Sequence, residues 1–196
     1  SSSTDPSGGV FYPDYFGKDF VLNDLTHDGG LTAIRIEGPT NSVDQRANRL
    51  SKELGLLDQE LSILDSEQSN IFWSRTKNLE VFKSLKSNLL RIVLPMSETL
   101  QVIQKLKNFE IKYFIDWGGG LIWASFDQLN TKILSEIKDT VKKHQGYITL
   151  IKVEEDLKAS ADIFTIDPIK YKISEKIKRS FDPKRIFNPG KMYTGI

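Results

Sequence analysis

The stretch LLRIVLPMSETLQVIQKLKNFEIKYFIDWGGGLIWASF, residues 89–126, decides the fold. It opens with Leu89–Leu94, which is apolar on both faces except at Arg91 and so predicts a buried central strand. A guanidinium in such a strand must find an anion or reach solvent along its stem. Pro95 ends the strand, and Ser97 is the predicted cap of the next helix. The apolar stripe of that helix is Leu100, Ile103 and Leu106.

Two more strands follow at once, Ile111–Asp116 and Leu121–Phe126. They are joined by Trp117 and the three glycines 118–120, and so short a connection predicts an antiparallel hairpin. Two interpretations of Gly118, Gly119 and Gly120 stay open. They form a turn that needs positive φ, or they let a partner's backbone or a flat ring approach closely.

A second helix and a last strand complete this region. The helix has apolar residues at every fourth position and is predicted to end at Gly146. The strand after it is Tyr147–Val153. The apolar residues of the helix are Leu129, Ile133, Ile137 and Val141. The order β-α-β-β-α-β is that of the ferredoxin-like pattern. We therefore predict an α+β fold, with one antiparallel sheet and helices packed on one face.

The region before residue 89 predicts a smaller unit. Residues 1–30 are expected to be a linker and an irregular, aromatic-rich arm, because aromatics stand among Gly, Pro and Asp. Leu31–Glu37 alternates like a half-buried strand, and Ser42 and Gln45 form a plausible capping box for a helix that Gly55 stops. A further short strand is expected at Leu61–Leu64.

A helix is predicted over Ser69–Leu85, with Ser69 as its cap and Phe72 and Trp73 near its start. A bulky aromatic pair at this place usually belongs to the hydrophobic core.

The C-terminal part carries strong local signals. Asp167 and Pro168 predict the start of a helix that continues into FDPKRIFNPGKMY, residues 181–193. Asp182 before Pro183 predicts another capped first turn. Asn188-Pro189-Gly190 predicts an extended residue, a fixed φ and a residue at positive φ. Since such a constrained tail is unusual at a chain end, we expect it to dock on something.

Composition excludes several classes of function. The net charge is +1, which gives no reason to expect a nucleic-acid partner, and no apolar run reaches the roughly 18 residues of a membrane span. Without cysteine there is no disulfide and no thiolate chemistry. The two histidines, His27 and His144, stand apart, so no metal motif occurs. His27 is interpreted as a turn residue, with a ligand or a base as the alternative, and His144 as a cation at a helix C-terminus.

Several of these pieces together resemble a known family. Phe72-Trp73, the strand at 90–94, IDWGGGLIWAS at 115–125 and the NPGK ending at 188–191 are similar to FAD-linked oxidases of the vanillyl-alcohol oxidase type. Within that family they resemble the FAD-binding E subunit of bacterial glycolate oxidase. The resemblance covers nearly the whole chain and implies that residues 31–196 are the C-terminal cap domain.

The resemblance implies a function and a set of cofactor contacts. A flavin would perform the hydride chemistry on glycolate, a 2-hydroxy acid, to give glyoxylate, while the cap encloses the ring. The implied FAD-contacting residues are Asn188, Arg91, Gly118, Gly119, Gly120, Phe72, Trp73 and Lys191. The implied partners are a catalytic flavoprotein subunit and an iron–sulfur subunit, in the cytoplasm or at the inner membrane through those subunits.

Two departures from the family pattern limit what the resemblance implies. The FAD-binding module that precedes the cap is absent from this chain, so we expect FAD to be bound by the full-length subunit and poorly retained here. The sister subunits carry a histidine-rich metal motif where this chain has Asp116-Trp117 and the three glycines, so substrate oxidation by this subunit itself is in doubt. The alternative is a ferredoxin-like regulatory or subunit-assembly domain with no redox role.

Overall fold

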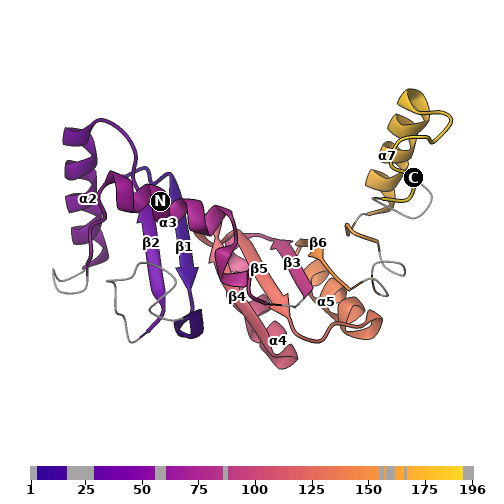
Figure 1. Ribbon diagram of the computed structural model, residues 1–196, viewed down its shortest axis with the longest axis horizontal. Helices are drawn as coiled ribbons and strands as arrows, with labels where there is room; N and C mark the ends of the chain where they lie inside the picture. The colour runs from indigo at the N-terminus through magenta and orange to yellow at the C-terminus, as the bar shows by residue number, and fades with distance from the viewer. Residues whose placement is uncertain are drawn as a thin grey trace. The chain divides into compact units, whose positions relative to one another are not determined.

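The computed structural model (Figure 1) describes residues 4–16, 29–55, 61–85, 88–154, 157, 162–165 and 167–191. The fold is α+β, with a six-stranded antiparallel sheet in the order β2-β1-β4-β5-β3-β6. The strands are β1 Gly8–Tyr12, β2 Leu31–Arg35, β3 Asn88–Val93, β4 Ile111–Asp116, β5 Leu121–Phe126 and β6 Tyr147–Lys152. The α-helices are α2 Thr40–Leu54, α3 Ser66–Lys77, α4 Thr99–Leu106, α5 Thr131–Lys143 and α7 Pro168–Phe181.

The chain divides into two compact units. Unit 1 comprises Ser1–Leu85 and Phe114–Gly118, and unit 2 comprises Lys86–Tyr113 and Gly119–Ile196. The six-residue strand β4 therefore contributes residues to both units. Each unit is described below by itself.

Unit 2 contains the predicted ferredoxin-like arrangement. The elements follow one another as β3-α4-β4-β5-α5-β6, and the strand order β4-β5-β3-β6 is the order of that pattern. Strand β3 is central, paired in antiparallel register with β5 and β6, as its apolar sequence predicted. The first and last residues of β4 and of β5 are those that the sequence predicted.

The core of unit 2 lies under helices α4 and α5, which pack against each other. Leu90 and Ile92 of β3 are fully buried, and their cross-strand neighbours on β5 and β6 continue the same face. The fully buried side chains that complete this core include Val102, Leu106, Ile122, Ile137, Val141 and Ile148. Because side chains alternate along a strand, Arg91 lies on the opposite face of the sheet.

Unit 1 is built on a hairpin that the sequence did not predict. Residues 8–12 form β1 and pair with β2 from Gly8↔Arg35 to Tyr12↔Leu31, so the expected linker and irregular arm are wrong over these residues. Gly8 and Gly9 have the composition of a linker, but the pairing with β2 satisfies their backbone groups. Residues 17–28, with His27, lie outside the described residues.

Several helix starts differ from the predicted ones. Helix α2 begins after Pro39 with no side-chain cap, so the predicted capping box of Ser42 and Gln45 is wrong. Helix α3 starts earlier than predicted, because Asp65 and Gln68 form a reciprocal capping box with N···O distances of 2.8 and 3.2 Å. Its predicted cap, Ser69, lies within the helix.

Other local predictions are corrected in the same way. No strand forms at residues 61–64, where the backbone runs irregularly into α3. Helix α4 begins at Thr99 with Glu98 at its cap position, and Leu100 points outward while Val102 takes its place in the core. The predicted cap Ser97 lies one residue before this position, and the Glu98 side chain makes no cap hydrogen bond, so the sequence did not identify how α4 begins.

Helix α7 begins as predicted. Asp167 accepts hydrogen bonds from the amides of Ile169 and Lys170, each at 2.9 Å, and Pro168 occupies the first turn. No residue of α7 is buried. Its exposed apolar side chains are Ile169, Ile173, Ile177 and Phe181, with exposed fractions of 71, 53, 55 and 85%.

Candidate functional site

The face of the unit 2 sheet that carries Arg91 is the best candidate for a binding surface. Arg91 is half-buried at the centre of β3 and lies directly opposite Trp123 of β5 and Thr149 of β6. Opposite residues in antiparallel strands have Cβ atoms about 5 Å apart. Arg91 therefore shares one face of the sheet with Trp123 and Thr149.

The rest of this face is mixed in character. Tyr147, at the start of β6, pairs with Val93 and is 44% exposed, whereas Ser125 of β5 is buried opposite Leu89. An arginine fork can bind a carboxylate through two parallel hydrogen bonds, and flat aromatic side chains favour a planar ligand. The surface thus has the chemistry to bind a small organic acid beside a ring.

Sequence reasoning selected Arg91 but missed its neighbours. Trp123 and Thr149 occupy the same face because of the strand register, which the sequence does not state. The sequence nevertheless contained a signal for these two neighbours. Once the order β4-β5-β3-β6 is assumed, alternate residues of β5 and β6 can be assigned to the face of Arg91.

The three glycines form the predicted tight hairpin. Gly118 and Gly119 have φ of +61° and +115°, and Trp117 before them also has a positive φ of +53°. The hydroxyl of Thr99 donates to the Gly119 carbonyl at 2.5 Å, and the Leu94 amide donates to the Gly120 carbonyl at 3.2 Å. The turn interpretation is therefore confirmed.

Close approach of a backbone also occurs, within unit 1. A Cβ on Gly9 of β1 would lie 3.3 Å from the Cα of Gly118. Such a distance is tighter than ordinary van der Waals contact, so the chain's own β1 strand occupies the space beside this glycine.

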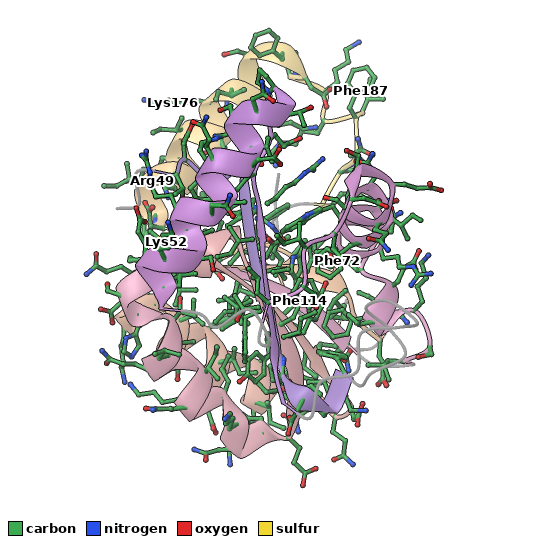
Figure 2. All side chains as sticks on the ribbon, turned by 90° about the vertical axis from the view of Figure 1, so that its left-hand side faces the viewer. Arg49, Lys52, Phe72, Phe114, Lys176 and Phe187 are labelled. Atoms are coloured by element: carbon green, nitrogen blue, oxygen red, sulfur yellow. The ribbon has the colours of Figure 1, made fainter. Side chains whose placement is uncertain are left out.

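Phe72 and Trp73 belong to an aromatic cluster in unit 1. Phe72 is 2% exposed, and its ring centroid lies 6.3 Å from that of Tyr12 and 5.2 Å from that of Trp73. Tyr12 also contacts Phe114, at 4.8 Å, and Figure 2 shows Phe72 and Phe114 among the interior side chains. Phe72 is therefore a core side chain, while Trp73 is half-buried beside Gly8.

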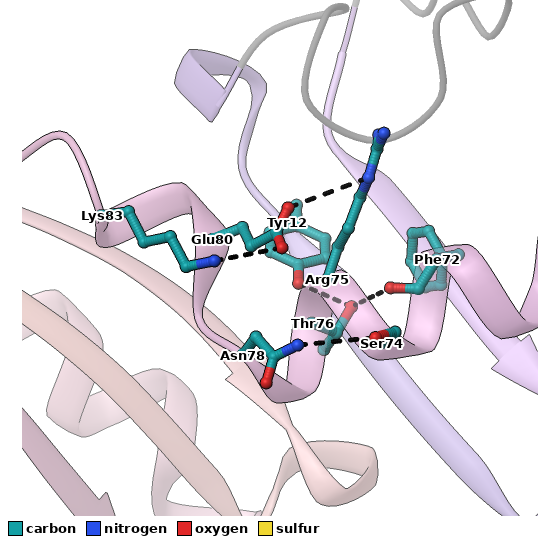
Figure 3. A network of polar contacts seen from close by, with 8 residues as sticks. All are labelled: Tyr12, Phe72, Ser74, Arg75, Thr76, Asn78, Glu80 and Lys83. Carbon is teal, nitrogen blue, oxygen red and sulfur yellow. Dashed lines mark hydrogen bonds and ion pairs between the residues drawn. The ribbon is translucent and has the colours of Figure 1, made fainter.

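A polar network holds α3 to this cluster (Figure 3). The Tyr12 hydroxyl donates to Thr76 at 2.9 Å, and the Thr76 hydroxyl donates to the carbonyl of Phe72 at 3.1 Å. Burial raises the pKa of Tyr12 well above its usual value. At the rim Glu80 pairs with Lys83 at 3.2 Å and with Arg75 at 3.8 Å.

The C-terminal tail is held by Asp182. Its carboxylate accepts hydrogen bonds from the amides of Ile186 and Phe187, at 3.0 and 2.9 Å, and from Lys178 at 2.7 Å. The hydrogen bond from Lys178 is the largest cause that lowers the pKa of Asp182 to about 2. Asp182 therefore stabilises the predicted turn, but it does so at the C-cap position of α7, and no helix begins at Pro183 as the predicted cap required.

The predicted turn at 188–190 is present with one difference. The Lys191 amide donates to the Asn188 carbonyl at 3.2 Å, and Gly190 has a φ of +67°. Asn188 was expected to be extended and instead has a φ of +47°. Asparagine tolerates this left-handed region better than most residues, so the turn closes on both sides of Pro189. The side chains of Asn188 and Lys191 are exposed.

The predicted site residues thus fall into three groups. Arg91, Gly119 and Gly120 belong to unit 2, Gly118 with the two aromatics of α3 belongs to unit 1, and the tail turn brings Asn188 and Lys191 together. Residues 192–196, including the end of the predicted stretch, lie outside the described residues.

These residues fit only part of an FAD molecule. The face of Arg91 suits a flat ring and a carboxylate, but binding a pyrophosphate requires several backbone amides aimed at one point. In the glycine hairpin the carbonyls of Gly119 and Gly120 are engaged, and the first amides of α7 are capped by Asp167. The face of Arg91 therefore fits contact with a ring and a carboxylate, and the first amides of α7 are already engaged by Asp167.

A third polar cluster lies in unit 2 and was not predicted. His144, at the C-terminal cap of α5, bonds Glu98 and Lys105 through its two ring nitrogens, at 2.6 and 2.8 Å. The sequence placed His144 at a helix C-terminus but could not show its partners, which lie about 40 residues earlier.

Comparison with protein-family models and with curated proteins finds no match to this chain. Among the described residues, no three His, Cys, Asp or Glu side chains are grouped so as to hold a metal ion. None of the helices within the described ranges is long and apolar enough to cross a membrane.

Proposed function

We propose that this chain is the cap domain of an FAD-binding subunit of a flavin-dependent 2-hydroxy-acid oxidoreductase, with glycolate as substrate and glyoxylate as product. The observation that carries the proposal is Arg91, placed on the interior strand β3 and on the sheet face opposite Leu90 and Ile92. A cap must present its own cation to the substrate anion, and a strand paired on both sides is a rigid place for one.

In this proposal the two parts of the subunit have different tasks. The flavin, bound by its own module, accepts the hydride. Arg91 binds the carboxylate of the 2-hydroxy acid and orients its reacting carbon, while the aromatic surface around Trp123 excludes water. FAD is poorly retained without the module because its phosphates are not bound by the cap.

The tail has a part in the same proposal. The hydrogen bonds that Asp182 accepts from the amides of Ile186 and Phe187, here called the Asp182 clamp, hold the tail that contains the turn at 188–191. In this turn Asn188 can offer its amide to the flavin or to a neighbouring backbone, and Lys191 can approach an anion. The remaining partners would be the catalytic flavoprotein and iron–sulfur subunits of a cytoplasmic or membrane-peripheral complex.

A second candidate function is subunit assembly without a redox role. It is favoured by helix α7, whose four exposed apolar side chains form one stripe. A stripe of this kind in a folded helix usually marks a contact with another protein surface. This candidate predicts binding of a partner without any flavin.

The experiment compares Arg91→Ala with Lys112→Ala in the assembled oxidase complex, with the subunit carrying its flavin module. Lys112 is an exposed cation of β4 and serves as the matched control. We expect Arg91→Ala to raise KM for glycolate by about 10- to 100-fold, because a hydrogen bond to a charged group is worth about 1.5–3 kcal/mol. The flavin content of both variants should equal that of the wild type.

Two results would contradict the proposal. One is a folded Arg91→Ala subunit with unchanged KM. The other is a subunit that assembles with its partners but contains no flavin, which would support the assembly function instead.

A further inference from the structure

The cluster of Glu98, His144 and Lys105 in unit 2 forms a continuous hydrogen-bonded chain. Glu98 lies in the short turn Met96–Glu98 before α4, Lys105 in the last turn of α4, and His144 at the end of α5. The Glu98 Oε2 atom is 2.6 Å from His144 Nδ1, and His144 Nε2 is 2.8 Å from Lys105 Nζ. Three groups from separate elements therefore meet end to end.

The chemistry of the end groups determines where the protons lie. A lysine ammonium only donates hydrogen bonds, so the Nε2 atom of His144 must accept. The imidazole hydrogen is then on Nδ1 and donates to Glu98. The carboxylate fixes the tautomer and the ring orientation, and it stabilises the imidazolium that forms when Nε2 takes a proton.

The two ends of the chain differ in their access to solvent. The imidazole of His144 is 10% exposed and Glu98 is 28% exposed, whereas Lys105 is an exposed residue. The base is therefore shielded from competing water, and a small molecule from solution can reach the amine. This arrangement of carboxylate, imidazole and nucleophile is one that activates the nucleophile.

We propose that Lys105 is an acylation site that reacts with small acyl thioesters, with His144 as the base and Glu98 as its positioning residue. One ammonium proton passes from Lys105 Nζ to His144 Nε2. The nitrogen lone pair then attacks the thioester carbonyl carbon, the N–C bond forms and the C–S bond breaks. The leaving thiolate takes the second nitrogen proton, and the imidazolium releases its proton to water.

The cluster favours a thioester over a less activated acyl donor. It supplies one base beside the amine, and the carboxylate of Glu98 is engaged with His144 on the far side of the ring. A thiolate departs without being protonated first, whereas an amine or alkoxide needs an acid. A thioester therefore makes the smallest demand on a cluster whose one base has already taken the amine proton.

The test measures acetylation of individual lysines. The purified chain is incubated with S-acetyl-N-acetylcysteamine, and the rate at each lysine is followed by mass spectrometry of peptides. Lys132, an exposed residue in the first turn of α5, is the internal reference. We expect Lys105 to react at least about tenfold faster than Lys132, a modest part of what a positioned base contributes.

Two variants and a denatured sample complete the experiment. In urea the ratio of the two rates should fall to about one. His144→Gln should abolish the advantage of Lys105 while Lys132 still reacts at its wild-type rate. Glu98→Gln keeps an acceptor for Nδ1 but removes the charge, so it should reduce the ratio of the Lys105 rate to the Lys132 rate several-fold. If His144→Gln does not fold, the Glu98→Gln result tests the proposal in its place. Equal rates at Lys105 and Lys132 in the folded chain, or an undiminished ratio in a folded variant, would overturn the proposal.

Discussion

Helices α5 and α7 have the same apolar periodicity and opposite surroundings. In α5 the residues at successive fourth positions include Ile137 and Val141, which are fully buried. In α7 the corresponding residues include Ile169 and Ile173, which are mostly exposed. An apolar stripe in the sequence therefore predicts a helix equally well in both cases, but it does not show whether a partner surface is present.

The local signals of the two helices are also alike. Asn130 caps α5 by accepting a hydrogen bond from the Ile133 amide at 2.9 Å, as Asp167 does for α7. The difference lies in what each helix is joined to. Residues 144–146 connect α5 directly to β6, and so short a connection makes the helix pack on its own sheet. The tail after α7 folds back on the helix through the polar contacts of Asp182 and Lys178.

The largest effect should come from truncating the buried stripe. Ile137→Ala should lower the free energy of unfolding by about 2–5 kcal/mol, because it leaves a cavity between α5 and the sheet. The matched variant Ile173→Ala in α7 should change it by less than about 0.5 kcal/mol. Urea denaturation of both variants measures the difference. Equal losses would mean that α7 is packed as tightly as α5, and the comparison would fail.

A smaller effect is expected at the glycines that follow the two helices. A Cβ on Gly146 would lie 2.7 Å from Val141 and 2.9 Å from the Val93 carbonyl, so Gly146→Ala should destabilise the chain by about 1–3 kcal/mol. A Cβ on Gly190 would meet nothing within 4 Å, so Gly190→Ala should strain only the tail turn. Thermal unfolding should therefore show a lower Tm for Gly146→Ala alone. A matching drop for Gly190→Ala would show that the tail belongs to the cooperative core.

The smallest effect is a local pH dependence in the tail. The folded-state pKa of Asp182 is about 2, below the value near 3.9 of a free carboxyl, so its clamp is fully formed above pH ~4 and is lost as the pH falls toward 2. We expect the amide NMR signals of Ile186 and Phe187 to shift only below about pH 3, while those of α5 stay unchanged. In Asp182→Asn these two signals should lose that pH dependence. A transition near pH 4 in the wild type would contradict the clamp.

Much of the fold could be predicted because its signals are local or periodic. The strands β4 and β5 and the start of α7 at Asp167 follow from two apolar segments, the glycine turn between them and a cap. Strand β1 could not be predicted in this way. Its glycines have no strand propensity, and only the pairing with β2 makes the segment regular.

The candidate site was predictable in part for the same reason. Arg91 stands out because a charge in an apolar strand is costly without a partner or solvent. Trp123 and Thr149 become its neighbours only through the register of three strands, and His144 meets Glu98 and Lys105 only through the packing of α4 and α5. Contacts between residues far apart in sequence depend on the tertiary arrangement.

The sequence by itself determined the α+β class, the β-α-β-β-α-β order and the turns at the glycines and at Asp182. Hydrophobic period, caps and positive-φ residues act within a few residues of one another, so they can be recognised in one dimension. Tertiary structure alone decided that Ile137 is buried while Ile173 is exposed, and which residues share the face of Arg91. Burial and register each depend on two segments that contact each other. The sequence of one segment does not identify the other.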